Sequence, residues 1–522
     1  MITLNLKSAK TKPETLASLN AITARLAAKD ATIWGPDAQS EAAIRLNWID
    51  LPLSSRELLP ELDALAAWAK AGSLSHVILA GMGGSSLAPE VISKTFKKNL
   101  TVLDATDPDQ IAAATPSDLS DVVVVVGSKS GSTIETASHK AYFTELFIKA
   151  GLSPADHLVI VTDPNSPLDK AARADGLKVI NADPNVGGRY SALSAFGLVP
   201  AALIGVDISI LLDDAAAAAA TFTTLDSAAV QLAAALFDAN HQNVAFNDTG
   251  SSVPGVSDWI EQLIAESTGK LQQGRLPIVI EGAGAPVAGP SLVVGFAESA
   301  LSSSDIFVNA TLGEHFILWE WVTALLGYCL AVNPFDQPNV TEAKERTGAL
   351  LEKWQAESNS KVPALQASYE DDVIAIFGAE SADSAEAALA HFLAQGSHYI
   401  AVMAYLARGI NDEISASREL LASATGRGVT FGWGPRFLHS TGQFHKGGQH
   451  NGAFLQITGE NHIDLAIPGR EFSFHTLLMA QALGDGEALA SRNFPVIRIH
   501  LKNRERGVVR VLELLRGLPR AI

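Results

Sequence analysis

DVVVVVGSKSGSTIET, at residues 121–136, joins five consecutive valines to a loop of glycine and hydroxyl residues. A β-branched run with no polar face predicts a strand buried on both sides in a parallel sheet. The segment after the loop, residues 134–143, is predicted to be a helix, and backbone N–H groups at a helix N-terminus attract anions. The loop is therefore either an anion cradle or a hydroxyl-rich turn that caps the helix without a ligand. This stretch alone leaves both interpretations open.

A second unit of strand, glycine loop and helix comes before the first. Its strand is predicted at residues 76–81, and the loop GMGGSS follows at residues 81–86. In a doubly wound sheet such loops lie together at the carboxyl edge of the strands, where ligands bind. Further strands are predicted at residues 100–104, 158–162 and 178–180. This alternation predicts a parallel α/β domain.

The rest of the chain continues the α/β pattern in two further parts. Strands are predicted at residues 244–247, 276–281 and 291–296. The polar stretch at residues 356–363 is the best candidate linker, and beyond it strands are predicted at residues 373–377, 399–406, 429–433, 454–458 and 496–501. These breaks predict three domains, at residues 1–230, 231–355 and 356–522.

Composition limits the classes of partner. The chain has 522 residues and a net charge of −18, which argues against nucleic acid because phosphate backbones need a basic protein face. No apolar run approaches the roughly 20 residues that a membrane span needs, and the N-terminus lacks the apolar core of a signal peptide. These observations predict a cytoplasmic protein without membrane contact. The single cysteine, Cys329, excludes an internal disulfide and is expected to be buried in an apolar helix.

The sequence lacks two motifs, one typical of zinc sites and one typical of nucleotide-binding enzymes. The spacing of His439, His445 and His450 fits no standard zinc pattern, and no cysteine or acidic cluster accompanies these residues, so no metal site is predicted. A P-loop nucleotide enzyme is also not expected, because the chain has no GxxxxGKS/T motif. At residues 185–191 the segment NVGGRYS places one arginine at a glycine turn, where it is either directed at a ligand or only solvated.

Several motifs, in order along the chain, resemble those of the phosphoglucose isomerase family. The matches, with the family pattern after each, are GMGGSSLAP at 81–89 (GIGGSxLGP), SKSGSTIET at 128–136 (SKTFTTxET), VGGRYSALSAFGL at 186–198 (VGGRxSxxSAxGL), ESTGK at 266–270 (ESNGK) and NPFDQPNVTEAK at 333–344 (NPFDQPGVExxK). The segment RFLHSTGQFHKGG, at residues 436–448, resembles the isomerase half of fused transaldolase/glucose-6-phosphate isomerase proteins.

The resemblance implies a fold and an activity. The fold would be α/β, with two parallel-sheet αβα sandwich domains of the sugar-isomerase (SIS) type and a C-terminal α/β lobe. The activity would be the reversible isomerisation of glucose 6-phosphate and fructose 6-phosphate, in glycolysis and gluconeogenesis, by ring opening and an enediolate intermediate. No cofactor would be needed, the partner would be a small sugar phosphate, and a homodimer is expected.

The family's roles carry over to matching positions of this sequence. Glu266 would be the base that moves the proton, Arg189 would stabilise the enediolate, and Lys344 would serve ring opening. The substrate-binding positions implied by the motifs are Gly84, Ser85, Ser128, Lys129, Ser130, Thr133, Gly188 and Gln337.

The chain departs from the family in its histidine. Family members carry a ring-opening histidine in a GTNGQH segment between the glutamate and the DQPG motif, whereas this chain has no histidine between Glu266 and Glu314. Our hypothesis is that the C-terminal lobe supplies His445, with His439 as second choice and Gln443 beside them as a substrate contact. The alternative is that these histidines are structural, or that they serve another substrate. Asn339 also replaces the family glycine after Pro338, near Lys344.

Two other functions fit the same motifs. A non-catalytic module of this fold would bind a sugar phosphate without converting it, and an isomerase of a related anionic sugar would use the same loops. The presence of both Glu266 and Lys344 favours an enzyme, because a sensor needs neither.

Overall fold

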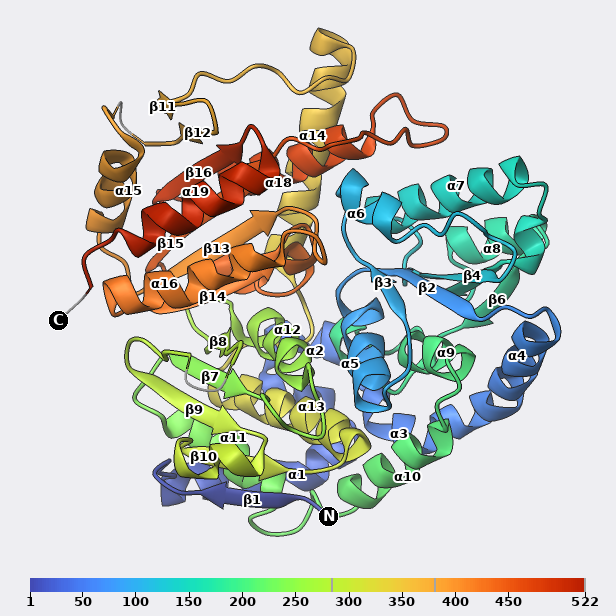
Figure 1. The fold of residues 1–522 in the computed structure, drawn as a ribbon. Helices are drawn as coiled ribbons and strands as arrows, with labels where there is room; N and C mark the ends of the chain where they lie inside the picture. The colour runs from blue at the N-terminus through green and yellow to red at the C-terminus, as the bar shows by residue number, and fades with distance from the viewer. Residues whose placement is uncertain (283–284, 380–381, 521–522) are drawn as a thin grey trace.

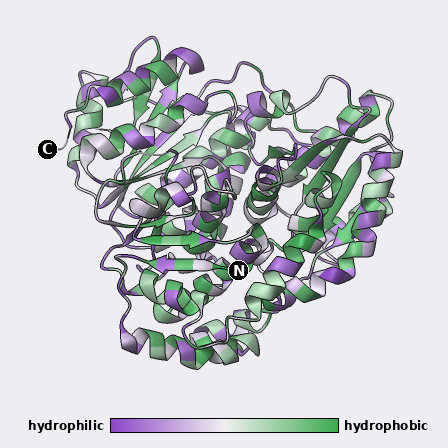
Figure 2. Cartoon of the chain, turned by 60° about the horizontal axis from the view of Figure 1, so that its bottom comes forward, coloured by the Kyte–Doolittle hydropathy of each residue, from purple (hydrophilic) through white to green (hydrophobic). Residues whose placement is uncertain are grey.

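Three β-sheets, each built mainly from a different part of the chain, organise the computed structural model, which describes residues 1–282, 285–379 and 382–520 (Figure 1). In Figure 2 the strands are largely hydrophobic, whereas many of the outer helices carry both hydrophobic and hydrophilic residues. This distribution is the one expected of parallel sheets covered by amphipathic helices. The predicted α/β class with parallel sheets is confirmed.

The first sheet contains the valine run at its centre. Its order is β3 (Thr101–Leu103), β2 (His76–Gly81), β4 (Val122–Gly127), β5 (Leu158–Thr162) and β6 (Lys178–Asn181), and all neighbours are parallel. The helices of this part are α4 (Leu59–Ala71), α5 (Leu87–Thr95), α6 (Pro108–Ala113), α7 (Ile134–Lys149), α8 (Pro167–Ala174) and α9 (Ala195–Leu203).

The valines of β4 are buried on both faces, as predicted. Val123 and Val125 lie in one apolar core, which contains side chains of α5 and α9. Val124 and Val126 lie in another, which contains side chains of α7. Because successive side chains of a strand point to opposite faces, an unbroken apolar run is what a strand between two helical layers requires.

The second sheet comes next in the chain, and its edge strand, β1 (Thr3–Leu6), was not predicted from the sequence. The order of this sheet is β1, β10 (Ile306–Asn309), β9 (Ser291–Gly295), β7 (Asn243–Asn247) and β8 (Leu276–Val279). β1 pairs antiparallel with β10, and the other neighbours are parallel. β1 is too short for a periodic sequence pattern to reveal it. Associated helices are α1 (Pro13–Ala27), α2 (Pro36–Ala42), α3 (Leu51–Ser54), α10 (Ile208–Ala219), α11 (Ala228–Asp238), α12 (Val256–Thr268) and α13 (Leu312–Cys329).

The third sheet belongs to the C-terminal part. Its order is β11 (Tyr369–Glu370), β12 (Ile374–Phe377), β16 (Val496–Leu501), β15 (Gly452–Gly459), β13 (Tyr399–Tyr405) and β14 (Gly428–Trp433). β13 to β16 are parallel, while β12 pairs antiparallel with both of its neighbours. The helices are α14 (Pro338–Ser358), α15 (Ala385–Ala394), α16 (Ala416–Thr425), α17 (Gly442–Gly447), α18 (Phe474–Ala490) and α19 (Arg504–Arg516).

Apolar cores continue across the predicted domain boundaries. One core runs from Leu19 to Phe335 and so joins the helices around the first two sheets. Another combines the first sheet with Trp354 of α14 and Phe474 of α18. The boundaries at residues 230 and 355 therefore stay a prediction. Among the described residues, no helix is both long and apolar enough to cross a membrane.

Glu320 is a carboxyl group placed inside this apolar framework. It lies in α13 with no exposed surface, and neither of its carboxyl oxygens has a hydrogen-bond partner among the described residues. Burial disfavours the charged form and raises the pKa of Glu320 well above its ordinary value of 4.5. Above about pH 4.5 this carboxyl is ionised in the unfolded chain, so folding takes up a proton at Glu320.

This proton uptake predicts that Glu320→Gln increases the stability of the fold by an amount that depends on pH. A raised folded pKa means that the stability is fully present below the unfolded pKa and is lost as the pH rises, and a glutamine has no such loss. We expect the unfolding free energy of the variant, relative to the unmodified chain, to increase by on the order of 1 kcal/mol per pH unit between about pH 5 and pH 7. Urea unfolding at several pH values measures it, and a pH-independent difference would contradict a buried neutral carboxyl.

Candidate active site

A cavity of about 400 Å³ opens where the loops after β2 and β4 meet α12, α14 and the short 3-10 helix η9 (Arg436–His439). Such a position, at the carboxyl edge of parallel strands, is the usual ligand site of an open α/β sheet. Most of the site residues predicted from the sequence line this cavity: Gly84, Ser85, Ser128, Lys129, Ser130, Thr133, Gly188, Arg189, Glu266, Gln337, Lys344 and His439. Gln443 and His445 are not among its lining residues.

The loop after β4 presents hydroxyl groups that the protein leaves without hydrogen bonds. Ser128 is 3% exposed, and its Oγ has no hydrogen-bond partner among the described residues. Thr133 is the N-cap residue of α7, yet its side chain makes no capping hydrogen bond. A buried hydroxyl without a partner is costly unless a ligand or water satisfies it. The anion-cradle interpretation of this loop is therefore the better supported one.

The two glycine loops contact each other directly. A Cβ added to Gly84 would lie 2.0 Å from the carbonyl oxygen of Gly188. No side chain fits at Gly84, so the loop after β2 can approach the VGGR turn only because it carries glycine at this position, whereas a Cβ at Gly188 would meet no atom within 4 Å. This contact brings Ser85 and Arg189 to the same cavity.

Two cations stand at the hydroxyl loop. Lys129 Nζ lies 2.7 Å from Asp163 Oδ2 and donates to the carbonyl of Pro184 at 3.0 Å. Arg45 donates to the same carbonyl at 3.1 Å from Nη1. Burial, together with the charge of Arg45, lowers the pKa of Lys129, although Asp163 opposes this shift. Arg45 and Asp163 also line the cavity, and no motif pointed to either residue.

Arg189, in the VGGR motif, makes hydrogen bonds to two further motifs. Its guanidinium is buried and donates to Ser267 Oγ at 2.7 Å, in the ESTGK segment. It also donates to the carbonyls of Pro334 and Asp336 at 2.7 and 2.9 Å and to Gln337 Oε1 at 2.9 Å, all in the NPFDQP segment. The planar fork of donors explains why an arginine is needed at this turn. The structure therefore directs Arg189 into the protein rather than to solvent.

Glu266 lies beside this arginine in the last turn of α12. Its carboxyl Oε1 is 3.4 Å from Arg189 Nη1, and its Oε2 accepts from Gln262 Nε2 at 3.2 Å. Gln262 also donates to the carbonyl of His439 at 2.8 Å, so one amide fixes both the carboxylate and the histidine segment. The sequence motifs did not include Gln262, although its position four residues before Glu266 on a helix was a usable signal.

His439 lines the cavity, and the buried carboxylate of Glu135 holds its ring. Its Nε2 lies 3.0 Å from Glu135 Oε1, and Gln481 Nε2 donates to the same oxygen at 2.8 Å. Burial alone would raise the pKa of Glu135, but the charges of His439 and Lys344 hold it below its ordinary value. Lys344 itself makes no ion pair or hydrogen bond with the described residues and projects from α14 at the cavity. Glu135, within the SKSGSTIET motif, was also missed.

The first-choice histidine lies elsewhere. His445 is buried against the third sheet, with its Nδ1 3.2 Å from the Tyr399 hydroxyl and its ring stacked on Tyr399. Burial lowers the pKa of His445 to about 3, so the ring is neutral at neutral pH. His445 is therefore not among the residues that line the cavity, whereas the second-choice histidine, His439, is.

Gln443 also serves the framework rather than the cavity. Its amide donates to the carbonyl of Gly269 at 3.0 Å and to Asn339 Oδ1 at 2.8 Å, and it accepts from Asn339 N at 2.9 Å. The substrate-contact assignment of Gln443 is therefore corrected. These bonds also show what the departure at Asn339 does, because its side chain connects the start of α14 to α17.

Comparisons with known proteins agree with this geometry. A family model described as phosphoglucose isomerase matches residues 58–276, which include Ser85, Ser128, Arg189 and Glu266 but end before Lys344 and His439. A glucose-6-phosphate isomerase of Thermus thermophilus is 33% identical over 251 residues, covering 45% of this chain and 59% of the relative. A probable glucose-6-phosphate isomerase of Haloquadratum walsbyi is 33% identical, covering 40% and 50%. The chain thus spans about half the length of these curated relatives.

One longer match and two solved structures extend the comparison. A glucose-6-phosphate isomerase of Citrifermentans bemidjiense is 28% identical, covering 66% of this chain and 80% of the relative. The structure of a hypothetical protein from Thermus thermophilus superposes with a TM-score of 0.56 at 25% identity, covering 69% of this chain and all of that one. A Chlamydia trachomatis glucose-6-phosphate isomerase gives a TM-score of 0.57 at 19% identity, covering 68% and 89%, which shows a shared fold. Residues 58–276 of this chain thus match the phosphoglucose isomerase family.

Proposed function

We propose that this protein is a glucose-6-phosphate isomerase, which interconverts glucose 6-phosphate and fructose 6-phosphate. The observation that carries the proposal is that Glu266 and Arg189, 3.4 Å apart, share one cavity with the unpartnered hydroxyl of Ser128. An acid–base group, a cation and an anion cradle are the three parts that an aldose–ketose isomerisation of a phosphorylated sugar needs.

The proposed mechanism assigns one end of the substrate to each side of the cavity. The phosphate binds the hydroxyls of the loop after β4 and the N-terminus of α7, which orients the sugar. Glu266 takes the proton from C2 and returns it to C1, and Arg189 stabilises the negative oxygen of the enediolate between these steps. The proton moves between two carbons of one molecule, so no redox cofactor takes part.

Ring opening is assigned to His439 of η9 and Lys344 of α14, which line the same cavity. His439, held by Glu135, and the cation of Lys344 stand where the ring oxygen and the anomeric hydroxyl would lie. Opening requires a proton to be given to the ring oxygen and another to be taken from the hydroxyl, and an imidazole can do either. The family model's match ends before both residues, so Lys344 is supported by the motif at residues 333–344 and His439 by the geometry of the cavity.

The assay that tests the function follows glucose 6-phosphate. Purified protein is incubated with fructose 6-phosphate, and the product is coupled to its dehydrogenase. Turnover supports the proposal, whereas binding without turnover would identify a non-catalytic sugar-phosphate module. Mannose 6-phosphate as the substrate tests the related-sugar alternative, if its product fructose 6-phosphate is converted by an added glucose-6-phosphate isomerase before the dehydrogenase. The homodimer implied by the resemblance and the cytoplasmic location predicted from the composition stay predictions.

His439→Asn is expected to slow a ring-closed substrate by about 10–100-fold, because general acid–base help is lost at the ring oxygen. An open-chain aldose phosphate, which skips that step, should lose much less. Steady-state rates on both substrates measure the ratio. His391→Gln, at an exposed position of α15, is the matched control. Equal losses on both substrates would show that His439 is structural.

Arg45→Gln is expected to raise KM for the sugar phosphate about tenfold with little change in kcat, because a charged contact that binds the phosphate in ground and transition states alike is lost. The inhibition constant of inorganic phosphate should rise by a similar factor. Arg56→Gln, which removes a cation paired with Asp213 outside the cavity, is the control. A fall in kcat at constant KM would contradict a role in anchoring the phosphate.

A further inference from the structure

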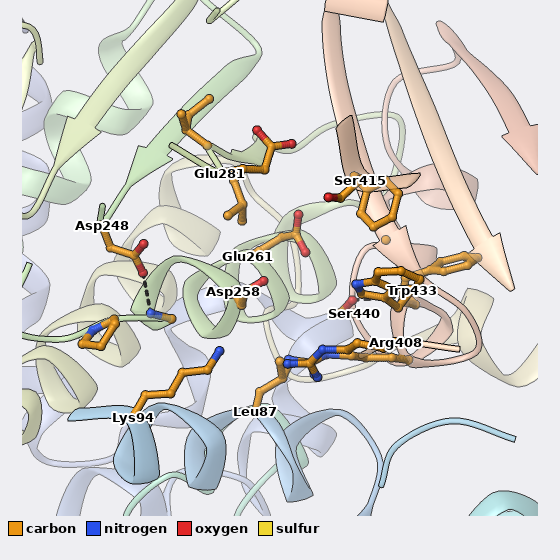
Figure 3. Close-up of a pocket in the computed structure, with 18 residues that line it drawn as sticks. Leu87, Lys94, Asp248, Asp258, Glu261, Glu281, Arg408, Ser415, Trp433 and Ser440 are labelled. Carbon is orange, nitrogen blue, oxygen red and sulfur yellow. Dashed lines mark hydrogen bonds between the residues drawn. The ribbon is translucent and has the colours of Figure 1, made fainter. Parts of the chain in front are cut away.

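A second cavity, of about 410 Å³, lies between the three sheets and is separate from the active site (Figure 3). Its walls come from α5, from α12 and β8, and from β14 and η9. Glu261 on α12 and Ser440 after η9 line this cavity, while their sequence neighbours Gln262 and His439 line the active site. The two cavities therefore lie on opposite sides of the same two segments.

The three cations that line this second cavity are paired with acids outside its wall. Glu90 pairs with Lys94 at 2.8 Å, with Arg436 at 2.7 Å and with Arg408. Arg436 also lies 3.0 Å from Asp104. These two acids, which lie outside the cavity wall, offset two of the three positive charges. The lining also includes Asp248, Asp258, Glu261 and Glu281, of which Glu281 pairs with Arg418, so acids still outnumber cations at the cavity.

The acids that face the cavity are not neutralised in the same way. Glu261 is only 9% exposed, and neither its carboxyl nor that of Asp258 makes a hydrogen bond or ion pair with the described residues. Asp258 is half-buried and lies three residues before Glu261 on α12, so both carboxyls share one helix face. Figure 3 shows the Glu261 carboxyl directed into the space between Glu281, Ser415 and Trp433.

Burial makes this arrangement costly without a countercharge. Burial and the charge of Asp258 raise the pKa of Glu261 well above its ordinary value, although Arg436 opposes the shift. A positive charge beside the two carboxyls would remove that penalty. Among the described residues no group of three or more metal-ligating side chains is present, so a bare metal ion lacks the ligands it needs here.

The wall opposite the acids is aromatic. Phe431 and Trp433 project from β14 with ring centroids 5.1 Å apart and planes at 83°. The face of an indole attracts cations and also packs against alkyl groups. Together, two unpartnered carboxyls and an aromatic wall suit a charged nitrogen attached to a short hydrocarbon body.

We propose that this cavity is a binding site for a small organic ammonium ion, held by Glu261 and Asp258 on one side and by Trp433 on the other. The proposal does not depend on the isomerase activity. An occupant would contact the residues next to Gln262 and His439, so binding is expected to change the turnover of the neighbouring active site as well.

The test is calorimetric titration of the full chain with putrescine at physiological ionic strength, with butanediol as its uncharged analogue. We expect putrescine to bind and butanediol not to bind. Glu261→Gln should weaken putrescine at least about tenfold, because a charged hydrogen bond in a buried site is lost. Glu419→Gln, at an exposed position of α16, changes the net charge equally and should leave the affinity unchanged.

Three results would overturn the proposal. Equal binding of butanediol would identify a site for neutral polyols, and equal weakening by Glu419→Gln would show diffuse attraction to an acidic protein. Unchanged affinity in Glu261→Gln would exclude the cavity. If Glu261→Gln does not fold, as circular dichroism would show, Asp258→Asn and Trp433→Leu replace it, and both must weaken putrescine for the proposal to stand.

Discussion

Glu266→Gln is expected to lower kcat for the conversion of fructose 6-phosphate by about 10³-fold, because an amide cannot take the proton from the sugar carbon. The change keeps the shape of the side chain, and the one remaining oxygen can contact either Arg189 or Gln262, which reach different oxygens of Glu266. Phosphate anchoring is untouched, so KM should stay within about threefold of its original value. Steady-state kinetics and direct binding of the sugar phosphate measure the two effects separately.

Two controls make this result specific to the base. Glu352→Gln, at an exposed position of α14, removes one acid away from the cavity and should leave kcat unchanged. Exchange of the substrate C–H hydrogen with deuterated solvent should be lost together with turnover in Glu266→Gln. Near-normal turnover in that variant would mean that another group moves the proton, and Glu135 at His439 would be the next candidate.

Local sequence patterns were sufficient for the first sheet and its loops. The run at Val122–Val126 has one stable placement, between two helical layers, and glycine is required at Gly84, where the loop after β2 touches the backbone of Gly188. Each of these features is decided by neighbouring residues or by a single close approach. They could therefore be predicted with the correct position and the correct environment.

Partners that come from distant parts of the chain could not be predicted in this way. Arg45 reaches the cavity from an irregular N-terminal segment, and only the shared carbonyl of Pro184 shows what it does. His439 and His445 lie six residues apart in one motif, and the turn between η9 and α17 decides which of them faces the cavity. The sequence offers no signal for that turn, so it could not show that His439, and not His445, lines the cavity.

Arg189→Lys is expected to lower kcat/KM by about 10²–10³-fold, because stabilisation of the enediolate oxygen needs a cation held in a fixed position. A lysine keeps the charge but cannot span Ser267, Gln337 and the carbonyl of Pro334 at once. The carbonyls left without a donor are buried, so the unfolding free energy should also fall by about 1–3 kcal/mol. Kinetics and urea unfolding of the same sample measure both losses.

Kinetics of a fully folded sample distinguish two roles of Arg189, a structural role and the stabilisation of the enediolate. If it only ties the motifs together, a temperature low enough to restore full folding should restore the rate, and KM and kcat should recover together. If it stabilises the enediolate, kcat stays low in a fully folded sample, because the charge is misplaced at the reacting oxygen. Arg173→Lys, an exposed arginine with similar carboxylate contacts, should change neither quantity appreciably. Wild-type kcat in folded Arg189→Lys would remove this residue from the mechanism and leave Lys344 as the next candidate for stabilising the enediolate.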